Sequence, residues 1–440
     1  MSHGFAERSF WLGATPYEPR PALAGDRRAD VAIVGGGFTG LCTAHFLREL
    51  EPSLDVVVLE SEVVGYGASG RNGGFSMTLF GLTLGMTKAM FGRERAVAAH
   101  HYMEEAVETL ERLVGELGIG SDYERPGFLR VATSPAYVKR IQHEIALAQS
   151  LGLEGISWLE RDEVRALVDS PTYLGAWSEP RCGLINPAKQ ARGLAAAVRR
   201  AGVEVYERTP VGAIERGGDG FTLKTPGGAV RAERVVLATN AYSHLRPELR
   251  RRQAPAFTHI VLTEPLSDAQ LNAIGWAGRQ GVETARNMVH YYRLTADNRL
   301  LMGGRDVSLA FGRDIEHDRN DATFAGLEDD VRTTFPSLRD VRFTHRWGGP
   351  VSVPIQMVPA LGRLGDPRMV YALGCMGHGV SLTHLNGRTL AELVLERETE
   401  RTSMWFVDRR VIPWPPEPLR YAASAAVRGA LRLQDRFTDA

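Results

Sequence analysis

The first hydrophobic positions of the chain fall into two short runs with a helical segment between them. Residues 31–34 and 56–59 are continuous apolar runs, as expected for parallel strands that are buried on both faces. Residues 41–50 lie between these runs and have the character of a helix. The pattern therefore predicts a strand, a helix and a second strand over residues 29–60.

The turn between the first strand and the helix is rich in glycine. Residues 35–40 read GGGFTG, in which Gly35 permits a tight turn, Gly37 lets the backbone approach a pyrophosphate and Gly40 allows close packing of helix on strand. Glu60 ends the second strand twenty residues after Gly40, where a carboxylate accepts hydrogen bonds from a ribose diol. Together these features predict a dinucleotide site, for either NAD or FAD. A purely structural glycine-rich turn is the alternative.

Farther along the chain, the pattern changes from a parallel framework to antiparallel strands. Residues 86–118 carry apolar side chains at helical spacing, and residues 209–237 form short strands separated by glycine turns. Alternating strands follow over residues 257–302. Antiparallel strands inserted into a parallel framework imply a second layer that covers the bound cofactor.

Composition narrows the class of protein. The 440 residues are 44% hydrophobic and 24% charged, with a formal net charge of zero. This balance is typical of a soluble globular protein and gives no support to binding of nucleic acid or membrane surfaces. No apolar run approaches 18 residues, and the first residues lack a secretory signal pattern, so we expect a cytoplasmic protein without a membrane span. Three dispersed cysteines predict neither a disulfide framework nor a zinc site.

Four motifs in this order resemble a known family. They are residues 34–40 with Glu60, residues 67–74 (GASGRNGG), residues 235–242 (VVLATNAY) and residues 374–380 (GCMGHGV). The combination resembles FAD-dependent oxidoreductases of the D-amino-acid oxidase superfamily. GASGRNGG, with WGGP at residues 347–350, looks most like the γ-glutamylputrescine oxidoreductase branch. The resemblance favours FAD over NAD.

The resemblance implies an α/β fold with two parts. One is a discontinuous, doubly wound (Rossmann-like) FAD domain, and the other is a substrate domain with an antiparallel sheet and helices. We expect an N-terminal arm (1–28), the FAD domain (29–95, 170–250 and 341–400), the substrate domain (96–169 and 251–340) and a C-terminal helical segment (401–440).

The resemblance also assigns residues to the cofactor. The pyrophosphate and ribose would be met by the first glycine turn and Glu60, the loop that follows would run towards the isoalloxazine, and the last motif would lie beneath the flavin's pyrimidine edge. The residues expected to bind FAD are Gly35, Gly37, Phe38, Thr39, Gly40, Glu60, Ser61, Ala68, Ser69, Gly70, Arg71, Asn72, Gly73, Val211, Ala238, Thr239, Gly377, His378, Gly379, Val380 and Ser381.

Two departures from the sarcosine oxidases of this superfamily affect the expected chemistry. Those enzymes hold FAD covalently through a cysteine in the region that reads RWGG at residues 346–349 here, so we expect non-covalent FAD. They also place a lysine where this chain has Ser381. The flavin's N1 region would then depend on the helix dipole and neutral donors, which argues against sarcosine-like activity.

The expected reaction is oxidation of a primary or secondary amine or amino acid. Hydride would pass from the carbon beside the amine to flavin N5, giving an imine that hydrolyses, with O2 as acceptor. The site should favour the neutral amine, because only this form gives up the hydride readily. Candidate catalytic residues near the open face of the flavin are His345, Trp347, Tyr292 and Arg293, of which Arg293 could clamp a substrate carboxylate.

Three other functions remain open at this point. One is a dehydrogenase that passes electrons to a quinone or a partner protein. Another is a flavin hydroxylase, although Gly365 and Asp366 read as a turn rather than as its glycine-aspartate motif. The last is a flavoprotein that acts on an RNA base, against which the absence of basic clusters argues. The oligomeric state is open, and we expect the arginines of the C-terminal segment to lie on a solvated helix face.

Overall fold

A mixed sheet with parallel central strands forms the first half of the fold. The computed structural model describes residues 4–315 and 317–439. Residues 1–3, 316 and 440, which belong to the expected arm, substrate domain and C-terminal segment, lie outside the described residues. The strand order is β18-β19-β11-β1-β2-β8, with β10 and β9 added beside β11. These strands are β1 (Arg27–Val34), β2 (Val56–Leu59), β8 (Glu204–Tyr206), β9 (Ala213–Arg216), β10 (Phe221–Thr225), β11 (Gly228–Leu237), β18 (Ala360–Leu364) and β19 (Asp366–Leu373).

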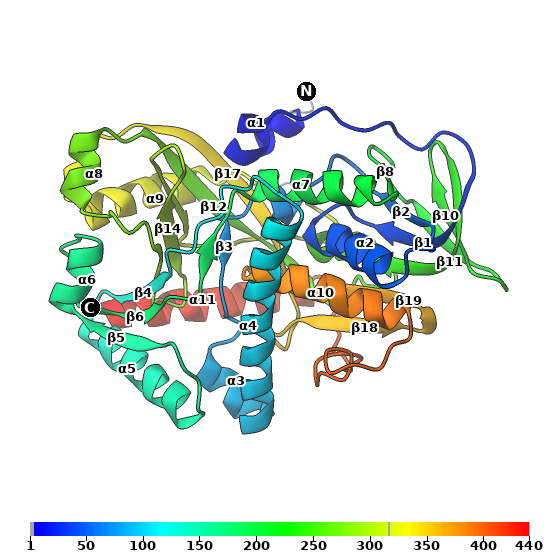
Figure 1. Cartoon of the computed structure of the whole chain (residues 1–440). Coiled ribbons are helices and arrows are strands. Elements are labelled where there is room, and N and C mark those ends of the chain that lie inside the picture. Colours follow the sequence, from blue (N-terminus) through cyan, green and yellow to red (C-terminus); the bar gives the residue numbers. More distant parts are fainter. Residues whose placement is uncertain (1–3, 316, 440) are drawn as a thin grey trace.

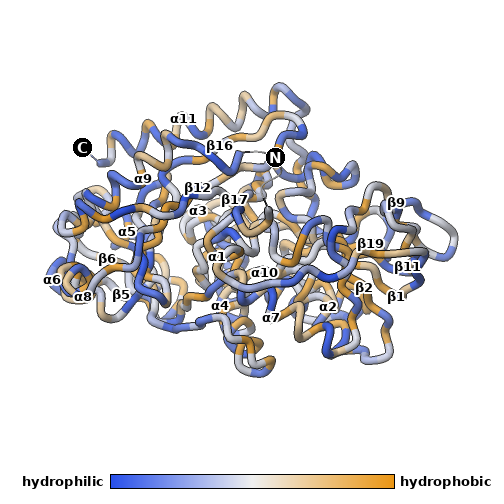
Figure 2. Tube along the Cα trace, turned by 90° about the horizontal axis from the view of Figure 1, so that it is seen from above, coloured by the Kyte–Doolittle hydropathy of each residue, from blue (hydrophilic) through white to orange (hydrophobic). Residues whose placement is uncertain are grey.

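The apolar runs form the centre of this sheet, as their pattern predicts. β1 pairs in parallel with β2 on one side and with β11 on the other. All four side chains of β2 are buried, and helices cover the sheet (Figure 1). The trace around β1, β2 and α2 is largely hydrophobic in Figure 2. The helices associated with this half are α2 (Phe38–Leu50), α4 (Arg93–Glu116), α7 (Pro187–Arg200) and α10 (Gly379–Val394).

A second, mostly antiparallel sheet forms the other half of the molecule. Its order is β16-β12-β15-β14-β13-β4-β6-β5, and β17 also pairs with β12. Only the β4–β13 pair is parallel among the pairs described for this sheet. The strands are β4 (Phe128–Ala132), β5 (Ser157–Glu160), β6 (Gly175–Glu179), β12 (Ala254–Pro265), β13 (Gly281–Thr284), β14 (His290–Leu294), β15 (Arg299–Gly304), β16 (Ser308–Leu309) and β17 (Phe343–Val353).

Helices pack against both faces of the second sheet. The helix α9 packs against β12 and β15 and shares an apolar core with them, which includes Phe324 and Leu327. The helices of this half are α5 (Pro135–Ser150), α6 (Arg161–Leu167), α8 (Asp268–Ile274), α9 (Asp321–Thr334) and α11 (Leu419–Asp439). The remaining elements are η1 (Phe5–Arg8), α1 (Phe10–Ala14), η2 (Ala68–Gly70), β3 (Phe75–Ser76), α3 (Leu84–Phe91), β7 (Gly183–Leu184), η3 (Asn240–Leu245) and η4 (Pro336–Leu338).

The architecture agrees with the predicted fold class of a parallel α/β part and an antiparallel part. The expected domain ranges stay a prediction, and two strands differ from them. β6 and β17 fall within ranges expected for the FAD domain, but both pair in the second sheet. β17 does so because its residues pair in register along most of β12.

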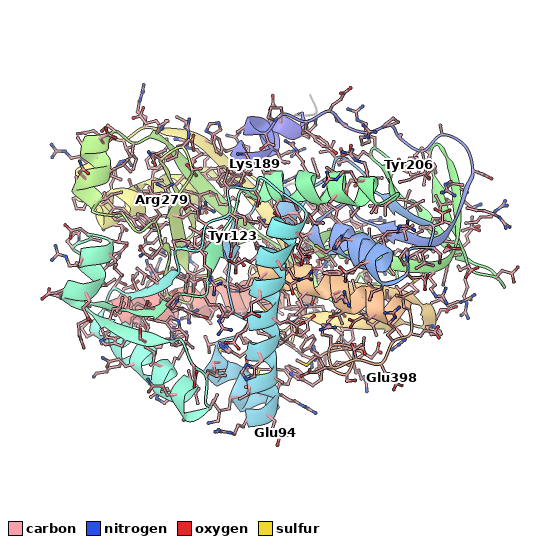
Figure 3. The ribbon with its side chains drawn as sticks, viewed as in Figure 1. Glu94, Tyr123, Lys189, Tyr206, Arg279 and Glu398 are labelled. Atoms are coloured by element: carbon pink, nitrogen blue, oxygen red, sulfur yellow. The ribbon has the colours of Figure 1, made fainter. Side chains whose placement is uncertain are left out.

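The outer surface carries charges of both signs. Glu94 and Glu398 are labelled among the side chains at the periphery of the molecule in Figure 3. Ion pairs of opposite charge are spread over the surface, as Arg112 with Glu116 and Arg165 with Asp169 illustrate. Within the described residues, no helix is long and apolar enough to cross a membrane.

Candidate active site

The glycine turn after β1 places the start of α2 against a large cavity. Gly35 has φ of +114°, and a Cβ at this position would lie 2.6 Å from the carbonyl oxygen of Ala238. A Cβ on Gly37 would lie 2.8 Å from Ser69 Oγ. The positive φ and the nearby carbonyl restrict position 35 to glycine, whereas a Cβ at position 37 would displace Ser69 Oγ, which accepts from the Phe38 N–H at 2.9 Å. The cavity thus reaches the start of α2.

Glu60 is held rigidly at the end of β2. Its carboxylate accepts hydrogen bonds from the backbone N–H of Gly36 at 2.7 Å and of Glu62 at 2.9 Å, and from Ser61 Oγ at 3.3 Å. Burial raises the pKa of Glu60, and these hydrogen bonds oppose that rise. The carboxylate lines the cavity and presents acceptors for hydroxyl groups, as the ribose site requires.

The loop of residues 67–74 is fixed by its own side chains. Asn72 Nδ2 donates to the carbonyl oxygen of Ala68 at 2.9 Å, and Asn72 Oδ1 accepts from the backbone N–H of Gly74 at 2.7 Å. Arg71 stacks over the ring of Tyr66 at 4.5 Å. The loop therefore holds one shape along the cavity wall without a ligand.

Residues from distant parts of the chain also hold this loop. Trp347 Nε1 donates to the carbonyl oxygen of Arg71 at 2.8 Å, and Trp11 Nε1 donates to that of Asn72 at 2.9 Å. Arg293 Nη1 donates to the carbonyl oxygen of Ile185 at 2.8 Å and lies 3.4 Å from that of Gly73. The N-terminal arm, β17 and β14 thus meet on one short loop.

The last motif forms the start of α10 on the cavity wall. His378 is the N-cap residue of α10, and its Nδ1 is buried without a hydrogen-bond partner among the described residues. Burial and the nearby Arg130 lower the pKa of His378 to about 4, so the ring is neutral at pH 7. The N–H groups of this helix start favour negative charge in the cavity beside them.

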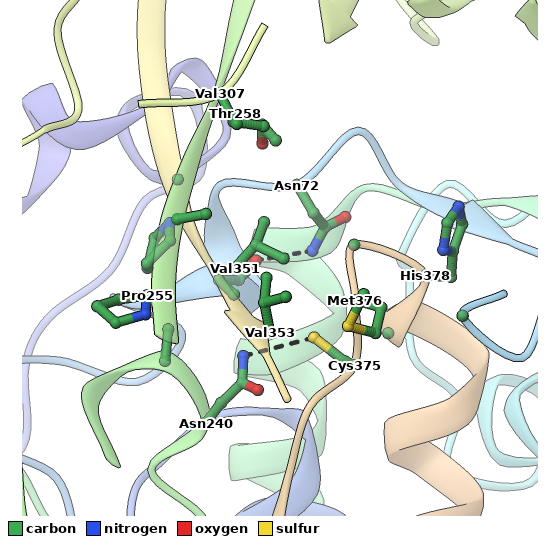
Figure 4. A pocket seen from close by; sticks show the side chains of 18 of the residues that line it. Asn72, Asn240, Pro255, Thr258, Val307, Val351, Val353, Cys375, Met376 and His378 are labelled. Atoms are coloured by element: carbon green, nitrogen blue, oxygen red, sulfur yellow. Dashed lines mark hydrogen bonds between the residues drawn. The ribbon is translucent and has the colours of Figure 1, made fainter. Parts of the chain in front are cut away.

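One cavity connects all these segments. Its volume is about 1130 Å³, and it extends from Glu60 past residues 67–74 to residues 375–380. Figure 4 shows part of its wall, with Pro255 and Thr258 of β12, Val351 and Val353 of β17, and Met376 before α10. The cavity has a volume of about 1130 Å³, and a helix start and the Glu60 carboxylate lie on its wall, so the residues present fit FAD.

Most residues expected to bind FAD line this cavity. Three do not, and each supports the wall from behind. Gly40 would clash with the carbonyl oxygen of Gly35 if it carried a Cβ, and Gly70 would clash with that of Gly65. Ser381 Oγ donates to the carbonyl oxygen of Met77 at 2.7 Å. The residues on the wall are Gly35, Gly37, Phe38, Thr39, Glu60, Ser61, Ala68, Ser69, Arg71, Asn72, Gly73, Val211, Ala238, Thr239, Gly377, His378, Gly379 and Val380.

The four candidate catalytic residues lie elsewhere. Tyr292 points into the core on the far side of the sheet, where its hydroxyl bonds to that of Tyr173 at 2.7 Å. Arg293 and Trp347 are buried and hold the loop of residues 67–74. His345 is exposed and contacts Thr344 at 2.9 Å. None of these side chains lines the cavity, so their expected contact with substrate finds no support in their positions.

Other residues form the side of the cavity beside the second sheet. Tyr291 points to the cavity because it alternates with Tyr292 along β14. Arg130 of β4, Glu283 of β13 and Thr258 of β12 line the cavity on the same sheet. The sequence predicted strands over residues 257–302, but it did not indicate which face of these strands lines the cavity.

The C-terminal helix is a further part of the wall that the sequence did not indicate. Ser424, Val427 and Leu431 of α11 line the cavity. Arg428 pairs with Asp306 at 2.6 Å, and Asp435 accepts from the backbone N–H of Met288 at 2.7 Å. The arginine face expected to be solvated therefore includes a residue that attaches α11 to the second sheet.

Asp366, which was considered for the hydroxylase alternative, has a structural role. Asp366 follows the turn at Gly365, opens β19 and pairs with Arg216 at 2.8 Å and Arg368 at 3.0 Å. These contacts fit a hairpin turn, and Asp366 does not line the cavity. Cys375 lines the cavity, and Asn240 Nδ2 donates to its Sγ at 3.5 Å (Figure 4). Within the described residues, no group of metal-ligating side chains is arranged to hold a metal ion.

Comparison with known proteins defines the class. The family described as FAD dependent oxidoreductase matches residues 30–393. A solved structure of glycine oxidase from Geobacillus kaustophilus has a TM-score of 0.73 at 24% identity, and the match covers 88% of this chain and 100% of that one. The chain therefore belongs to the FAD-dependent oxidoreductase family, and it is an FAD-dependent oxidoreductase. The predicted superfamily and fold class are confirmed.

Individual relatives refine this placement. The γ-glutamylputrescine oxidoreductase of Escherichia coli (strain K12) is 34% identical over 427 residues, which are 96% of this chain and 97% of that protein. A probable oxidoreductase OrdL of Rhizobium meliloti is 31% identical over 97% of both chains. The predicted likeness to the first of these relatives is confirmed.

Proposed function

We propose that this enzyme oxidises a primary or secondary amine, with FAD held non-covalently and O2 as the acceptor. The observation that supports the proposal most is the single cavity that joins the dinucleotide cradle at Glu60 to the second sheet at Tyr291. The likeness to a γ-glutamylputrescine oxidoreductase supports an amine as substrate. FAD, when bound, supplies the acceptor for the hydride that leaves the carbon beside the amine.

The chain's own residues would bind and desolvate the substrate. Met77, Val351 and Val353 give the cavity wall an apolar character near the loop of residues 67–74. An apolar wall disfavours the charged form of an amine, so it promotes the neutral form that can lose hydride. The start of α10 at residues 377–380 would stabilise negative charge that develops beside it. The resulting imine would hydrolyse to a carbonyl compound.

An anaerobic bleaching screen tests the reaction. The purified yellow protein is mixed with amines, amino acids and N-methyl amino acids, and the flavin absorbance near its visible maximum is followed. We expect bleaching by at least one amine. Bleaching by no amine at all would contradict the proposal.

Two further measurements test the acceptor and the mode of FAD attachment. Mixing the reduced protein with air-saturated buffer in a stopped-flow instrument should restore the absorbance within seconds. Reoxidation over minutes would instead favour a dehydrogenase with a quinone or protein acceptor. Acid precipitation should release the flavin into the supernatant, because no cysteine stands at residues 346–349. Flavin that stays with the pellet would point to Cys375, the cysteine on the cavity wall.

A further inference from the structure

The loop of residues 67–74 turns two successive carbonyl oxygens away from the cavity. The carbonyl oxygen of Arg71 accepts a hydrogen bond from Trp347 Nε1 at 2.8 Å, and that of Asn72 accepts one from Trp11 Nε1 at 2.9 Å. Arg71 and Asn72 line the cavity, whereas neither tryptophan does. The two indoles therefore hold these carbonyl oxygens on the side of the loop that faces away from the cavity.

The geometry of the peptide bond then fixes the direction of two N–H groups. In a trans peptide, the C=O of one residue and the N–H of the next point in opposite directions, and both peptide bonds are trans here. Because the carbonyls of Arg71 and Asn72 point to the indoles, the N–H groups of Asn72 and Gly73 point towards the cavity, which both residues line. Asn72 is labelled on the cavity wall in Figure 4.

These two N–H groups are the ones that the loop leaves without an acceptor. Among the described residues, nothing accepts a hydrogen bond from the N–H of Asn72 or of Gly73. The N–H groups on either side of them are paired, that of Arg71 with the carbonyl oxygen of Ala68 at 3.4 Å and that of Gly74 with Asn72 Oδ1 at 2.7 Å. Enclosed backbone N–H groups are rarely left unpaired, so this adjacent pair is available to an acceptor on a ligand.

Both tryptophans are held firmly behind the loop. They are buried in one small core, where they pack with Leu12 of α1, Ile260 of β12 and Leu301 of β15. Figure 1 shows α1 between the two halves of the molecule. An indole has a single N–H and no acceptor, so a fixed ring can bind a peptide group in one orientation only. The orientation of the two peptide groups is thus set before a ligand arrives.

We propose that Trp11 and Trp347 are positioning residues for the flavin, which turn the N–H groups of Asn72 and Gly73 towards the isoalloxazine ring. The proposal rests on the FAD cofactor of the proposed function and not on the proposed substrate. Two-electron reduction adds negative charge to the ring, and a hydrogen bond to a charged acceptor is stronger than one to a neutral acceptor. The two N–H groups therefore stabilise the reduced flavin more than the oxidised flavin, and they raise its midpoint potential.

The test removes one indole N–H at a time, in Trp11→Phe and in Trp347→Phe. The midpoint potential of the bound flavin is measured against a redox dye, and the apoprotein is titrated with FAD. We expect the reduced flavin to lose about tenfold in affinity relative to the oxidised flavin, which lowers the potential by about 30 mV. The two substitutions lie on different elements, α1 and β17, so either variant tests the proposal if the other fails to fold.

The matched control is Trp276→Phe. Trp276 is also buried, and its Nε1 donates to a backbone carbonyl oxygen, that of Gln280, at 3.1 Å, but neither residue lines the cavity. This variant loses the same kind of hydrogen bond, so its resistance to denaturant should fall by a similar amount. Its flavin should keep the midpoint potential of the wild type.

The outcomes separate a role towards the flavin from a merely structural one. Wild-type potentials in both Trp11→Phe and Trp347→Phe, or an equal shift in Trp276→Phe, would overturn the proposal. Weaker FAD binding without a change in potential would also overturn it, because the N–H groups would then meet another part of the cofactor. No amine takes part in these measurements. If the potentials fall but no amine bleaches the flavin, the proposed oxidation fails and the role of the two tryptophans stands.

Discussion

The two ends of the cavity are built in different ways. At the cofactor end, glycines let backbone N–H groups approach a ligand, and Gly35, Gly37 and Glu60 lie within 26 residues of one another. At the substrate end, side chains such as Glu283 and Tyr291 project from strands that long-range pairing brings together. A local motif encodes the first end and the register of a sheet encodes the second. The residues of the cofactor end can therefore be predicted from the sequence, whereas those of the substrate end cannot.

The largest effect on flavin binding is expected from a larger side chain at Gly37, in the glycine turn of residues 35–40. In Gly37→Val, the new Cβ would lie 2.8 Å from Ser69 Oγ, and its methyl groups would enter the space beside the helix start. We expect flavin binding to weaken about a hundredfold, in line with the cost of overpacking a tight site. The flavin-to-protein absorbance ratio and titration of the apoprotein with FAD measure this effect.

The control for the cradle is a glycine in open space. A Cβ on Gly115 of α4 would meet nothing within 4 Å, so Gly115→Ala should retain full flavin content. A Gly37→Val protein that binds flavin as tightly as this control would contradict the role assigned to the backbone in the cradle.

The next largest effect is expected from substitution of Arg293, which lies between the cofactor end and the substrate end. Arg293 is 2% exposed, and burial lowers its pKa to about 10, so it stays charged at pH 7. Arg293→Met would leave the carbonyl oxygens of Ile185 and Gly73 without their donor. We expect a loss of roughly 2–4 kcal/mol in unfolding free energy, and reduced flavin retention. Denaturant unfolding measures the first, and absorbance measures the second.

The same variant tests the carboxylate clamp that the sequence suggested. If Arg293 holds only the loop, the ratio of kcat/KM for an amine to that for the matching amino acid should stay unchanged. A loss of kcat/KM for the amino acid alone would instead support the hypothesis that Arg293 binds the substrate carboxylate. Arg339→Met serves as control, because this arginine is 80% exposed beside Asp340 and should change stability by less than about 1 kcal/mol.

Particular residues show where sequence reasoning succeeds and where it stops. The turn at residues 35–40 and the strands around it were predictable from the spacing of the glycines, although the contacts at Gly35 and Gly37 come from Ala238 and Ser69 elsewhere in the chain. Trp347 and Arg293 were expected near the open face of the flavin, whereas their side chains donate to carbonyl oxygens of the loop of residues 67–74 and do not line the cavity. The cavity role of α11 depends on Asp306 and Met288, more than 120 residues earlier in the chain, and no local pattern reveals such a contact.

Strand alternation can be tested with two adjacent tyrosines. Tyr291→Phe removes a hydroxyl beside the cavity, and Tyr292→Phe removes one in the core. We expect the first variant to change flavin reduction by an amine about fivefold, the value of one hydrogen bond. The second should leave the reduction kinetics intact and lower stability by about 1 kcal/mol, because the Tyr173 hydroxyl loses its partner. The opposite assignment of the two effects would mean that β14 presents its other face to the cavity.

The smallest effect is expected at His345, a candidate catalytic residue whose side chain does not line the cavity. The side chain is exposed, contacts Thr344 at 2.9 Å and packs edge-on against Phe10. Partial desolvation of the ring and the charge of Arg299 lower the pKa of His345, so the neutral ring predominates at pH 7. His345→Ala should therefore change stability by less than about 0.5 kcal/mol, and kcat/KM by less than about twofold. The pH dependence of the rate provides the check. If this variant loses an ionisation that the wild type shows, His345 takes part in the reaction although its side chain does not line the cavity.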